Sequence, residues 1–280
     1  MTPLVSVVCL SYNHERFVQQ AVQSVFDQTY SNIQLIVVDD FSSDSSMEAI
    51  RKAIAKSPET EIIRMEKNLG NCRAFNRGLQ SVRGQYVIDL SADDILVPTR
   101  IEKGVALLEQ DPGFGVQFSD AAIIDEDGKR KGFHSDAFPH ATIPSGSIFS
   151  EILGRYFINS PTMMIRKSVL DELGGYDESL AYEDFDFWVR SSRRWKYVYT
   201  PEALVSRRNL KTSMGKRQYI RGSAQLRSTL RVCEKALVLC ANQQEYGALK
   251  LRIRYEARRA VLVGSWNTAW GYWKLWRNIP

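Results

Sequence analysis

Three pairs of adjacent carboxylates are the side chains best suited to chemistry in this sequence. Asp39-Asp40 and Asp93-Asp94 each follow a short apolar run, and Glu183-Asp184 follows a glycine-containing tract. Carboxylates coordinate hard divalent cations, accept hydrogen bonds from N–H groups and take protons from hydroxyls. The same residue types also cap helices without any chemistry. The pairs therefore point to metal binding or proton transfer, with helix capping as the alternative for each.

The Asp93-Asp94 pair lies between an apolar run and Pro98. This position suits a cation, because Mg²⁺ or Mn²⁺ needs only one or two protein carboxylates when a diphosphate supplies the other oxygens. A helix that begins near Thr99 would give the pair a capping role instead. The Asp39-Asp40 pair also leaves two interpretations open: it accepts the N–H of a nucleotide base, or it caps the following helix.

The elements that must position these pairs follow from alternating strand and helix signals in the first 110 residues. Apolar, β-branched runs predict buried strands, and periodic apolar patterns predict the helices between them. The strands are expected at Val5–Leu10, Gln34–Val38, Glu61–Met65 and Gln85–Leu90, and the helices at about 15–27, 45–56 and 71–82. Helices between buried strands imply a parallel α/β sheet with right-handed crossovers.

Ligands of such a sheet bind beyond the carboxyl ends of its strands. Three polar clusters follow these ends, namely Ser11-Tyr12-Asn13, Asp39-Asp40 and Asp93-Asp94. We therefore expect the three clusters to meet at one edge of the sheet. No glycine-rich phosphate loop follows the first strand, so the sequence supports neither a P-loop enzyme nor a Rossmann dehydrogenase.

The order of elements loosens after Asp111. Strands are expected at 115–120, 121–125, 161–166, 196–199 and 203–206, and helices at 168–173 and 183–195. A turn at 126–128 fits a hairpin, and residues 129–145 lack periodicity and predict a mobile loop. From about 216 to 276 the pattern is helical and basic. These signals predict a domain at 1–210, with halves at about 1–110 and 111–210, and a basic helical extension at 211–280.

Composition and charge place the chain among globular proteins. Of 280 residues, 44% are apolar and 25% charged, and no apolar run reaches the roughly 20 residues that a membrane-spanning helix needs. Residues 1–186 contain 17 Lys and Arg against 28 Asp and Glu, whereas residues 187–280 contain 20 against 4. The basic part suits phosphate, an acidic glycan or an anionic membrane surface. The first residues lack a signal-peptide pattern, and the four cysteines share no metal or redox spacing, so we expect reduced thiols in the cytoplasm.

Four tracts, in the right order between about Val5 and Trp195, resemble family 2 glycosyltransferases of the GT-A fold. The tracts that resemble the nucleotide-binding half are VSVVCLSYNHERFVQQAVQSVFDQTYSNIQLIVVDDFSSDSS, NLGNCRAFNRGL and GQYVIDLSADDILVP, and the one that resembles the acceptor side is GGYDESLAYEDFDFWVR. The resemblance implies a Rossmann-like α/β fold, with a mixed, mainly parallel sheet flanked by helices. The residues beyond it are expected to form a C-terminal helical extension.

The resemblance also implies roles on the donor side. Tyr12 is expected to pack beside the donor base, with Leu10 and Ser11 lining the same pocket. Asp40 is expected to accept the uracil N3–H. Asp93 stands where the family's DXD motif has its metal-binding aspartate.

The DXD motif is incomplete in this sequence. Ser91 stands in place of the first aspartate, which leaves the metal site with less charge but keeps a hydroxyl that can bind a ribose hydroxyl. Asp94 is expected to contact the metal or the ribose. Phe75 stands where an arginine is common in the family, and Arg73 is expected to replace that arginine in the donor site.

The base that deprotonates the acceptor is assigned by the resemblance to Asp184, with Glu183 as the alternative. Both open a predicted helix, whose dipole favours an ionised carboxylate. A sugar hydroxyl is a very weak acid, so a carboxylate must accept its proton as the new bond forms. Asp186 is expected to face elsewhere on the helix, and Trp188 either stacks on a sugar ring or packs in the core.

Two further features leave their roles open. His14 lies close enough to Tyr12 in the sequence to contact the ligand, or it is a surface residue. Many family members have a histidine after the acceptor motif, and the tract 205–213, with the cations Arg207, Arg208 and Lys211, takes its place here. Whether these cations bind the diphosphate is left open by the sequence.

These residues lead us to expect an inverting, metal-dependent glycosyltransferase of the hexosyltransferase type. Its donor is a nucleotide-diphospho-sugar, expected to be UDP-linked. Its acceptor is a hydroxyl of a glycan or lipid-linked molecule in cell-surface polysaccharide synthesis, and its cofactor is a divalent metal, Mn²⁺ or Mg²⁺. A nucleotidyltransferase and a catalytically weak nucleotide-sugar-binding protein are the alternatives. No nucleic-acid partner is expected, because no base-stacking or groove-reading element is evident, and the sequence leaves a homo-oligomer open.

The C-terminal tract holds a cluster of aromatic residues, namely Trp266, Trp270, Tyr272, Trp273 and Trp276. Trp266, Trp270 and Trp273 are four and three residues apart and therefore share a helix face. Trp and Tyr favour the bilayer interface, and the cations nearby are drawn to anionic lipid. We therefore predict peripheral attachment to the inner face of the plasma membrane. The alternative is that these rings pack onto the catalytic domain or a second subunit.

Overall fold

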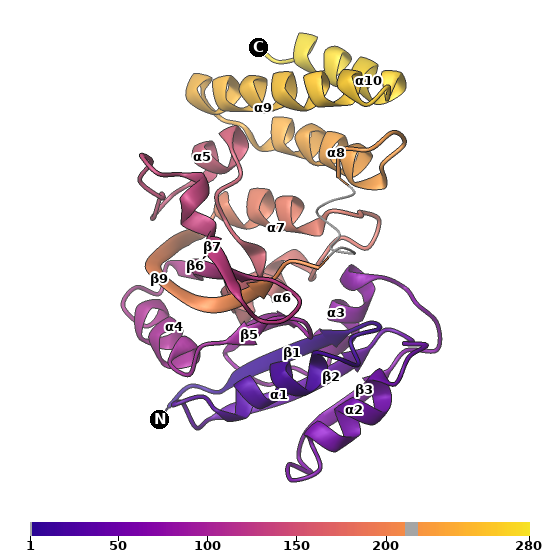
Figure 1. Ribbon diagram of the computed structural model, residues 1–280. Helices are drawn as coiled ribbons and strands as arrows, with labels where there is room; N and C mark the ends of the chain where they lie inside the picture. The colour runs from indigo at the N-terminus through magenta and orange to yellow at the C-terminus, as the bar shows by residue number, and fades with distance from the viewer. Residues whose placement is uncertain (1, 211–217) are drawn as a thin grey trace. The chain divides into compact units, whose positions relative to one another are not determined.

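The computed structural model describes residues 2–210 and 218–280, which form two compact units (Figure 1). The first unit consists of residues 2–143, 158–176 and 196–210, and it holds all the strands of the described chain. The second consists of residues 144–157, 177–195 and 218–280, and it is helical. Each unit is thus built from several segments of the chain. The division of the sequence at residue 210 remains a prediction about domains.

Among the described residues, nine strands form one mixed sheet in the first unit. They are β1 Val5–Ser11, β2 Ile33–Asp39, β3 Glu61–Arg64, β4 Tyr86–Ser91, β5 Ile95–Leu96, β6 Phe114–Ile124, β7 Arg130–Phe133, β8 Met164–Arg166 and β9 Lys196–Arg208. The order across the sheet is β3-β2-β1-β4-β8-β6-β9-β5, and β7 pairs with β6 beside this path. Strands β1 to β4 run parallel, as their buried apolar runs predicted, whereas β8 runs antiparallel to both of its neighbours.

Helices cover this sheet and bury their apolar sides against it. They are α1 Val18–Phe26, α2 Ser46–Ala53, α3 Asn71–Leu79, α4 Arg100–Leu108 and α6 Lys167–Leu173. This unit also contains the short 3-10 helices η1 His134–Ala137, whose residues are not buried, and η2 Ser160–Thr162. Helix α3 approaches the sheet very closely at Gly78. A Cβ atom there would lie 2.6 Å from Val8 Cγ1 and 2.9 Å from Val38 Cγ2, so this packing requires glycine.

The middle of the first unit differs from the sequence predictions. The two strands predicted at 115–120 and 121–125 are the single strand β6, and those at 196–199 and 203–206 are the single strand β9. The hairpin turn at 126–128 is present, with Gly128 at a φ of 83°. The prediction of a loop over 129–145 was wrong for residues 130–137, which form β7 and η1. Strand β7 is polar and depends on pairing with the backbone of β6, which its own sequence cannot reveal.

The second unit contains α5 Phe149–Gly154, α7 Glu183–Ser192, α8 Ala224–Leu239, α9 Gln243–Leu262 and α10 Trp266–Arg277. The C-terminal tract is thus helical as predicted, and its described part contains three helices. The side chain of Ser223 caps α8 by accepting a hydrogen bond from the N–H of Leu226. The predicted start of this tract near Lys216 lies outside the described residues. None of the helices described here is long and apolar enough to cross a membrane.

Buried polar contacts tie the helices of the second unit together. The guanidinium of Arg252 lies 3.6 Å from the ring centroid of Tyr156 and donates to the Leu153 carbonyl at 3.2 Å. Arg252 also forms an ion pair with the buried Glu256 at 3.4 Å. The two charges offset each other, which reduces the cost of burying either one. This cluster joins α9 to α5.

Candidate active site

The carboxyl ends of β1, β2 and β4 lie side by side at one edge of the sheet. Parallel pairing places Ser11 opposite Asp39, and Leu10 opposite Ser91. The polar clusters that follow these three strands are therefore brought together by strand register. This is the edge at which open α/β sheets bind their ligands.

The loops after β1 and β2 hold unusual backbone conformations and are bonded to each other. Asn13 and Phe41 are the two non-glycine residues with positive φ in the described chain, at 55° and 64°. Asparagine tolerates this conformation, but a bulky aromatic residue adopts it only where its surroundings enforce it. The N–H of Asn13 donates to Ser42 Oγ at 2.9 Å, and Asn13 Oδ1 accepts from the N–H of Ser43 at 2.9 Å. Backbone strain of this kind gathers at ligand sites.

Asp39 and Asp40 are both buried, and backbone N–H groups hold both of them. Asp39 accepts from the N–H of Ser42 at 3.1 Å. Asp40 accepts from the N–H groups of Leu69 and Gly70, each at 2.8 Å. Neither aspartate is the N-cap of α2. Each carboxylate oxygen of Asp40 can accept a second bond, and the bond from the uracil N3–H stays a prediction.

The end of β1 offers groups that a ligand could reach. Leu10 and Ser11 are buried, and Tyr12 is half exposed. Ser11 Oγ and His14 Nδ1 are buried atoms without a hydrogen-bond partner among the described residues. Burial lowers the pKa of His14, although nearby carboxylates such as Asp93 act in the opposite direction. His14 is therefore a neutral imidazole at pH 7 and can accept or donate a hydrogen bond.

Asp93 and Asp94 differ in accessibility and in partners. Ser91 Oγ donates to Asp93 Oδ1 at 2.5 Å, and the N–H of Arg208 donates to Asp94 Oδ1 at 2.7 Å. Asp94 is buried and Asp93 is partly exposed. Burial, together with the charge of Asp93, raises the pKa of Asp94 well above its usual range. The N-cap of α4 is Thr99, so the pair does not cap that helix.

Arg208 is a residue of this edge whose role the sequence did not reveal. Its Nε donates to the Asp93 carbonyl, and its Nη1 donates to the carbonyls of Asp125 and Glu126, all at 3.0 Å. Its Nη2 donates to Gln20 Oε1 at 2.9 Å. These acceptors lie 82 to 188 residues away in the sequence, beyond any local pattern. The buried guanidinium therefore holds the edge together and is not free to bind a diphosphate. Lys211, the third cation of this tract, lies outside the described residues.

A divalent cation would find few protein ligands at this edge. Within the described residues, no group of three His, Cys, Asp or Glu side chains could hold a metal ion. The Asp93 carboxylate and the Ser91 hydroxyl are hard oxygen donors, which suit Mg²⁺ or Mn²⁺. This set fits a cation that takes its other ligands from a diphosphate and from water. Arg207, which is partly exposed and close enough to act on the charge of Asp94, adds positive charge here.

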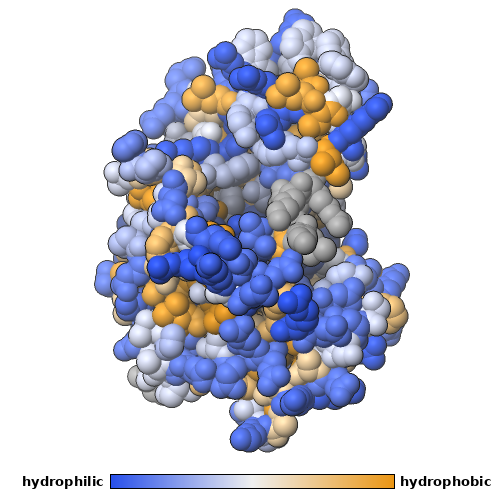
Figure 2. Space-filling model, viewed as in Figure 1, coloured by the Kyte–Doolittle hydropathy of each residue, from blue (hydrophilic) through white to orange (hydrophobic). Residues whose placement is uncertain are grey.

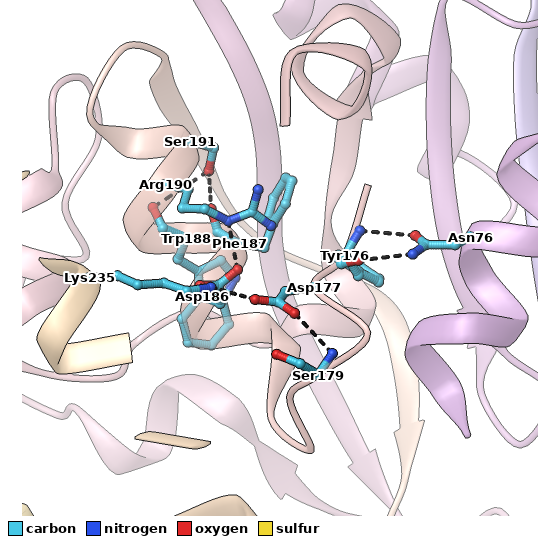
Figure 3. Close-up of polar contacts among 10 residues, drawn as sticks. All are labelled: Asn76, Tyr176, Asp177, Ser179, Asp186, Phe187, Trp188, Arg190, Ser191 and Lys235. Atoms are coloured by element: carbon cyan, nitrogen blue, oxygen red, sulfur yellow. Dashed lines mark hydrogen bonds and ion pairs between the residues drawn. The ribbon is translucent and has the colours of Figure 1, made fainter. Parts of the chain in front are cut away.

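Helix α3 fixes the segment that follows α6. Asn76 Nδ2 donates to the Tyr176 carbonyl at 2.8 Å, and Asn76 Oδ1 accepts from the N–H of Tyr176 at 2.9 Å (Figure 3). The hydroxyl of Tyr176 donates to Asp89 Oδ2 at 3.1 Å. The ring centroid of Tyr176 lies 4.5 Å from that of Phe75. Phe75, which replaces the family's arginine, is thus a core residue. Arg73 lies exposed in the first turn of α3.

In the second unit, the candidate base lies at the start of α7. Glu183 and Asp184 are both in the first turn of this helix. Glu183 is buried, whereas Asp184 is partly exposed. The helix dipole favours a negative charge at this end. Asp184 is therefore the more accessible of the two carboxylates, and Trp188 is buried in the same helix.

Asp186 lies on the buried side of α7 and is held by two cations (Figure 3). Arg190 Nε is 2.6 Å from Asp186 Oδ2, and Lys235 Nζ is 2.7 Å from Asp186 Oδ1. Lys235 Nζ is also 2.6 Å from Asp177 Oδ2, and the N–H of Ser179 donates to Asp177 Oδ1 at 2.9 Å. Lys235 thus joins the segment before α7 to the helix itself.

The contacts of this network stabilise the charged forms of Asp177 and Lys235. Partial burial would raise the pKa of Asp177, but the hydrogen bonds from Lys235 and Ser179 outweigh it and hold the pKa well below its usual range. Burial would lower the pKa of Lys235, but its bonds to Asp177 and Asp186 outweigh it and raise the pKa. Lys235 lies outside the tracts that carried the family resemblance, so sequence reasoning did not find it.

Two curated relatives resemble this chain along most of its length. An uncharacterised glycosyltransferase of Methanocaldococcus jannaschii is 32% identical over 211 residues, which cover 74% of this chain and 71% of the relative. The putative glycosyltransferase EpsE of Bacillus subtilis is 30% identical over 192 residues, which cover 67% of this chain and 66% of the relative.

Two solved structures share the fold. One is S. aureus TarS 1–349 in complex with UDP-GlcNAc, with a TM-score of 0.68, 16% identity and coverage of 92% of this chain and 73% of TarS. The other is the mannosyltransferase PcManGT from Pyrobaculum calidifontis in complex with GDP-Man and Mn²⁺, with a TM-score of 0.67, 15% identity and coverage of 96% and 78%. At these identities the likeness shows the fold, and it confirms the predicted GT-A fold with its mixed sheet.

The family model for glycosyl transferase family 2 matches residues 6–174, which is more than half of the chain. This match includes the strand ends that form the sheet edge described above. Together with the relative at 32% identity, it shows that the chain is a glycosyltransferase and belongs to glycosyl transferase family 2.

Proposed function

We propose that this glycosyltransferase moves a hexosyl group from a UDP-linked sugar to a hydroxyl of a glycan or lipid-linked acceptor, with inversion at the anomeric carbon. The observation that carries the proposal is the sheet edge where Ser11 ends β1, and where Asp40 and Asp93 follow the ends of β2 and β4. Solved proteins of the same fold hold UDP-GlcNAc and GDP-Man. A buried carboxylate such as Asp40 can accept the N3–H of uracil, as a UDP-linked donor requires.

Asp184 acts as the general base of this reaction. Its carboxylate takes the proton from the acceptor hydroxyl while the hydroxyl oxygen forms a bond to the anomeric carbon. The bond between that carbon and the diphosphate oxygen breaks, and the nucleoside diphosphate leaves with the electron pair. Because the displacement is single, the configuration inverts and no protein nucleophile is needed. A base in this role contributes about 10²- to 10⁴-fold to the rate.

The proposed metal ligands are Asp93 and the hydroxyl of Ser91. A bound Mn²⁺ or Mg²⁺ would offset the negative charge that develops on the leaving diphosphate. The hydrogen bond from Ser91 orients the Asp93 carboxylate. Arg207 adds a positive charge, as the metal ion would. Since a single carboxylate binds a cation weakly, the nucleotide and the cation are expected to bind together.

The proposed place of this reaction is the cytoplasm. All four cysteines are buried free thiols, which suits a reducing compartment. A lipid-linked acceptor would be presented at a membrane surface, and the corresponding process is the synthesis of a cell-surface polysaccharide.

A catalytically weak nucleotide-sugar-binding protein is the second candidate. It is favoured by one observation, the serine at position 91 in place of a metal-binding aspartate. The two candidates differ in turnover: a binding protein would take up the donor but would release no UDP when an acceptor is added.

Thermal unfolding with a panel of UDP- and GDP-linked sugars, with and without Mn²⁺, tests the donor assignment. A ligand at 100 times its Kd stabilises the folded state by about 2.7 kcal/mol. We expect a UDP-linked sugar with Mn²⁺ to raise the melting temperature most, and UDP release to follow with an acceptor. A larger rise with a GDP-linked sugar would overturn the choice of UDP. If no nucleotide-sugar raised the melting temperature, the donor site itself would be wrong.

A further inference from the structure

The outer side of α10 carries four exposed tryptophans. The exposed fractions of Trp266, Trp270, Trp273 and Trp276 are 65%, 53%, 43% and 42%, whereas Tyr272 and Leu275 of the same helix are buried. Within the described residues, these indoles therefore do not form part of a core. A cluster of large exposed apolar side chains of this kind marks a surface that binds a partner.

The tryptophans share their surface with cations. The rings of Trp270 and Trp273 are stacked, with centroids 4.4 Å apart. Lys274 Nζ lies 5.7 Å from the ring centroid of Trp270, and the guanidinium of Arg277 lies 4.9 Å from that of Trp273. Aromatic rings and positive charges are therefore in contact on this surface.

An exposed row along α9, from its middle to its C-terminal end, adds apolar and basic side chains to this part of the chain. Leu251, Tyr255 and Leu262 are exposed and recur at helical spacing, and Arg258 lies in the same row. Leu262 is separated from α10 only by the turn 263–265. Figure 2 shows apolar surface, in orange, over the part of the molecule that α9 and α10 form.

The charge of this surface selects the kind of partner. The acidic side chains of α9 and α10 are Glu245 and Glu256, and both are buried and paired with arginines. Every exposed charged side chain of these two helices is therefore positive. A partner must accept indoles and offer negative charge, and the headgroup region of an anionic bilayer does both.

We propose that α10, together with the C-terminal end of α9, docks onto an anionic lipid bilayer, with the tryptophans at the level of the headgroups. The inference rests on the proposed function only for the purpose of the docking, which is to bring the enzyme to a lipid-linked acceptor. The docking itself requires no catalysis. The alternative occupant of this surface is a second copy of the chain.

Co-sedimentation of the whole protein with vesicles tests the docking. Vesicles of phosphatidylcholine with phosphatidylglycerol should sediment the protein, and those of phosphatidylcholine alone should not. Substitution of Lys274 and Arg277 by Gln should weaken binding roughly thirtyfold, or about fivefold per cation. Binding should also fall as salt rises, because exposed charges are screened. The variant with Trp266, Trp270 and Trp273 changed to Ser should lose binding.

Val238→Ser is the matched control, because Val238 is exposed on α8 and lies outside this surface. It should bind vesicles as the parent protein does. Sedimentation velocity of every variant excludes self-association as the cause. Absence of vesicle binding at low salt, or a dimer that disappears with the tryptophans, would overturn the proposal. Unchanged donor affinity in the tryptophan variant keeps this test separate from that of the glycosyltransferase activity.

The network around Lys235 carries a second, independent inference. Lys235 lies on α8, and its Nζ contacts both Asp177 and Asp186, on either side of the segment that ends in Glu183 and Asp184. The N–H of Ala181, within that segment, donates to Ser228 Oγ of α8 at 2.8 Å. Helix α8 thus holds the segment that leads into the proposed base at two places.

We infer that Lys235 is a positioning residue for the base at the start of α7. Lys235 holds Asp177 and Asp186 in place, and this fixes the backbone between them. This inference rests on the proposed role of Asp184. A loss of Lys235 would move the carboxylate without removing it, so the rate of transfer would fall while donor binding, which takes place in the first unit, would not change.

Steady-state kinetics of Lys235→Met and Lys235→Arg test this inference. We expect kcat to fall about tenfold or more in Lys235→Met, with unchanged donor Kd, and to recover in part in Lys235→Arg. Lys167→Met removes a comparable ion pair, to Asp171 on α6, and should leave kcat unchanged. A normal kcat in Lys235→Met would overturn the inference. If Asp184→Asn were also fully active, the assignment of the base would be wrong instead.

Discussion

The carboxylates of the two units are held in different ways. In the first unit, Asp40 and Asp94 accept hydrogen bonds from backbone N–H groups. In the second unit, Asp186 is held by the side chains of Arg190 and Lys235, and Asp177 is held by Lys235 as well as by the N–H of Ser179. Most substitutions of a residue keep its backbone N–H group, whereas the substitution of a lysine removes its ammonium group. Asp40 and Asp94 should therefore tolerate changes in the side chains around them better than Asp186 does.

The largest expected effect is the loss of the base. Asp184→Asn should lower kcat by about 10² to 10⁴, because the amide cannot take the proton of the acceptor hydroxyl. Donor affinity should stay nearly unchanged, since the donor is proposed to bind in the other unit. Glu183→Gln is the matched control and should be far more active. If only Glu183→Gln is inactive, the role belongs to Glu183, and if both variants are active, the site is wrong.

Arg208 is the exception in the first unit, because this single side chain ties several loops together. Arg208→Met should destabilise the protein by about 2–4 kcal/mol, since it removes several hydrogen bonds of a buried side chain at once and leaves partly buried carbonyls without donors. Urea unfolding measures this change. Arg207→Met is the control, and it should leave the free energy of unfolding nearly unchanged because that side chain is partly exposed. Equal stability of the two variants would contradict the structural role given to Arg208.

The smallest expected effect is the dependence of stability on pH through Asp177. Its folded pKa lies below the unfolded value of about 3.9, so the stabilisation is present above that pH and is lost as the pH falls through the folded pKa. At pH 7, Asp177→Asn should be less stable than the parent by about 0.5–1 kcal/mol, since the pair with Lys235 is partly exposed. Below about pH 3 the two curves should approach each other. A constant difference across this range would show that Asp177 does not carry the effect.

The same contrast explains what the sequence could predict. The parallel strands and the edge at which Asp40 and Asp93 lie were predictable, because buried apolar runs and the helices between them are local signals. The strand β7 was not, since it forms by pairing with β6. Lys235 and Arg208 were not, because their acceptors lie tens of residues away or more.

The roles assigned to the site residues remain predictions. Register brings Ser11 and Ser91 to one edge, and it accounts for the strand-end clusters that the sequence singled out. It does not reveal the difference between Asp93 and Asp94. That difference arises because the antiparallel pairing of β5 with β9 brings the backbone of Arg208 to Asp94.

Calorimetric titration of UDP, with and without Mn²⁺, tests most directly whether the sheet edge is a metal-assisted donor site. We predict that Mn²⁺ strengthens UDP binding to the parent protein, and that Asp93→Asn loses this gain while it keeps its melting temperature. Asp93 is partly exposed, so its replacement should not disturb the fold. Equal affinity of the parent protein for UDP under both conditions would contradict the account.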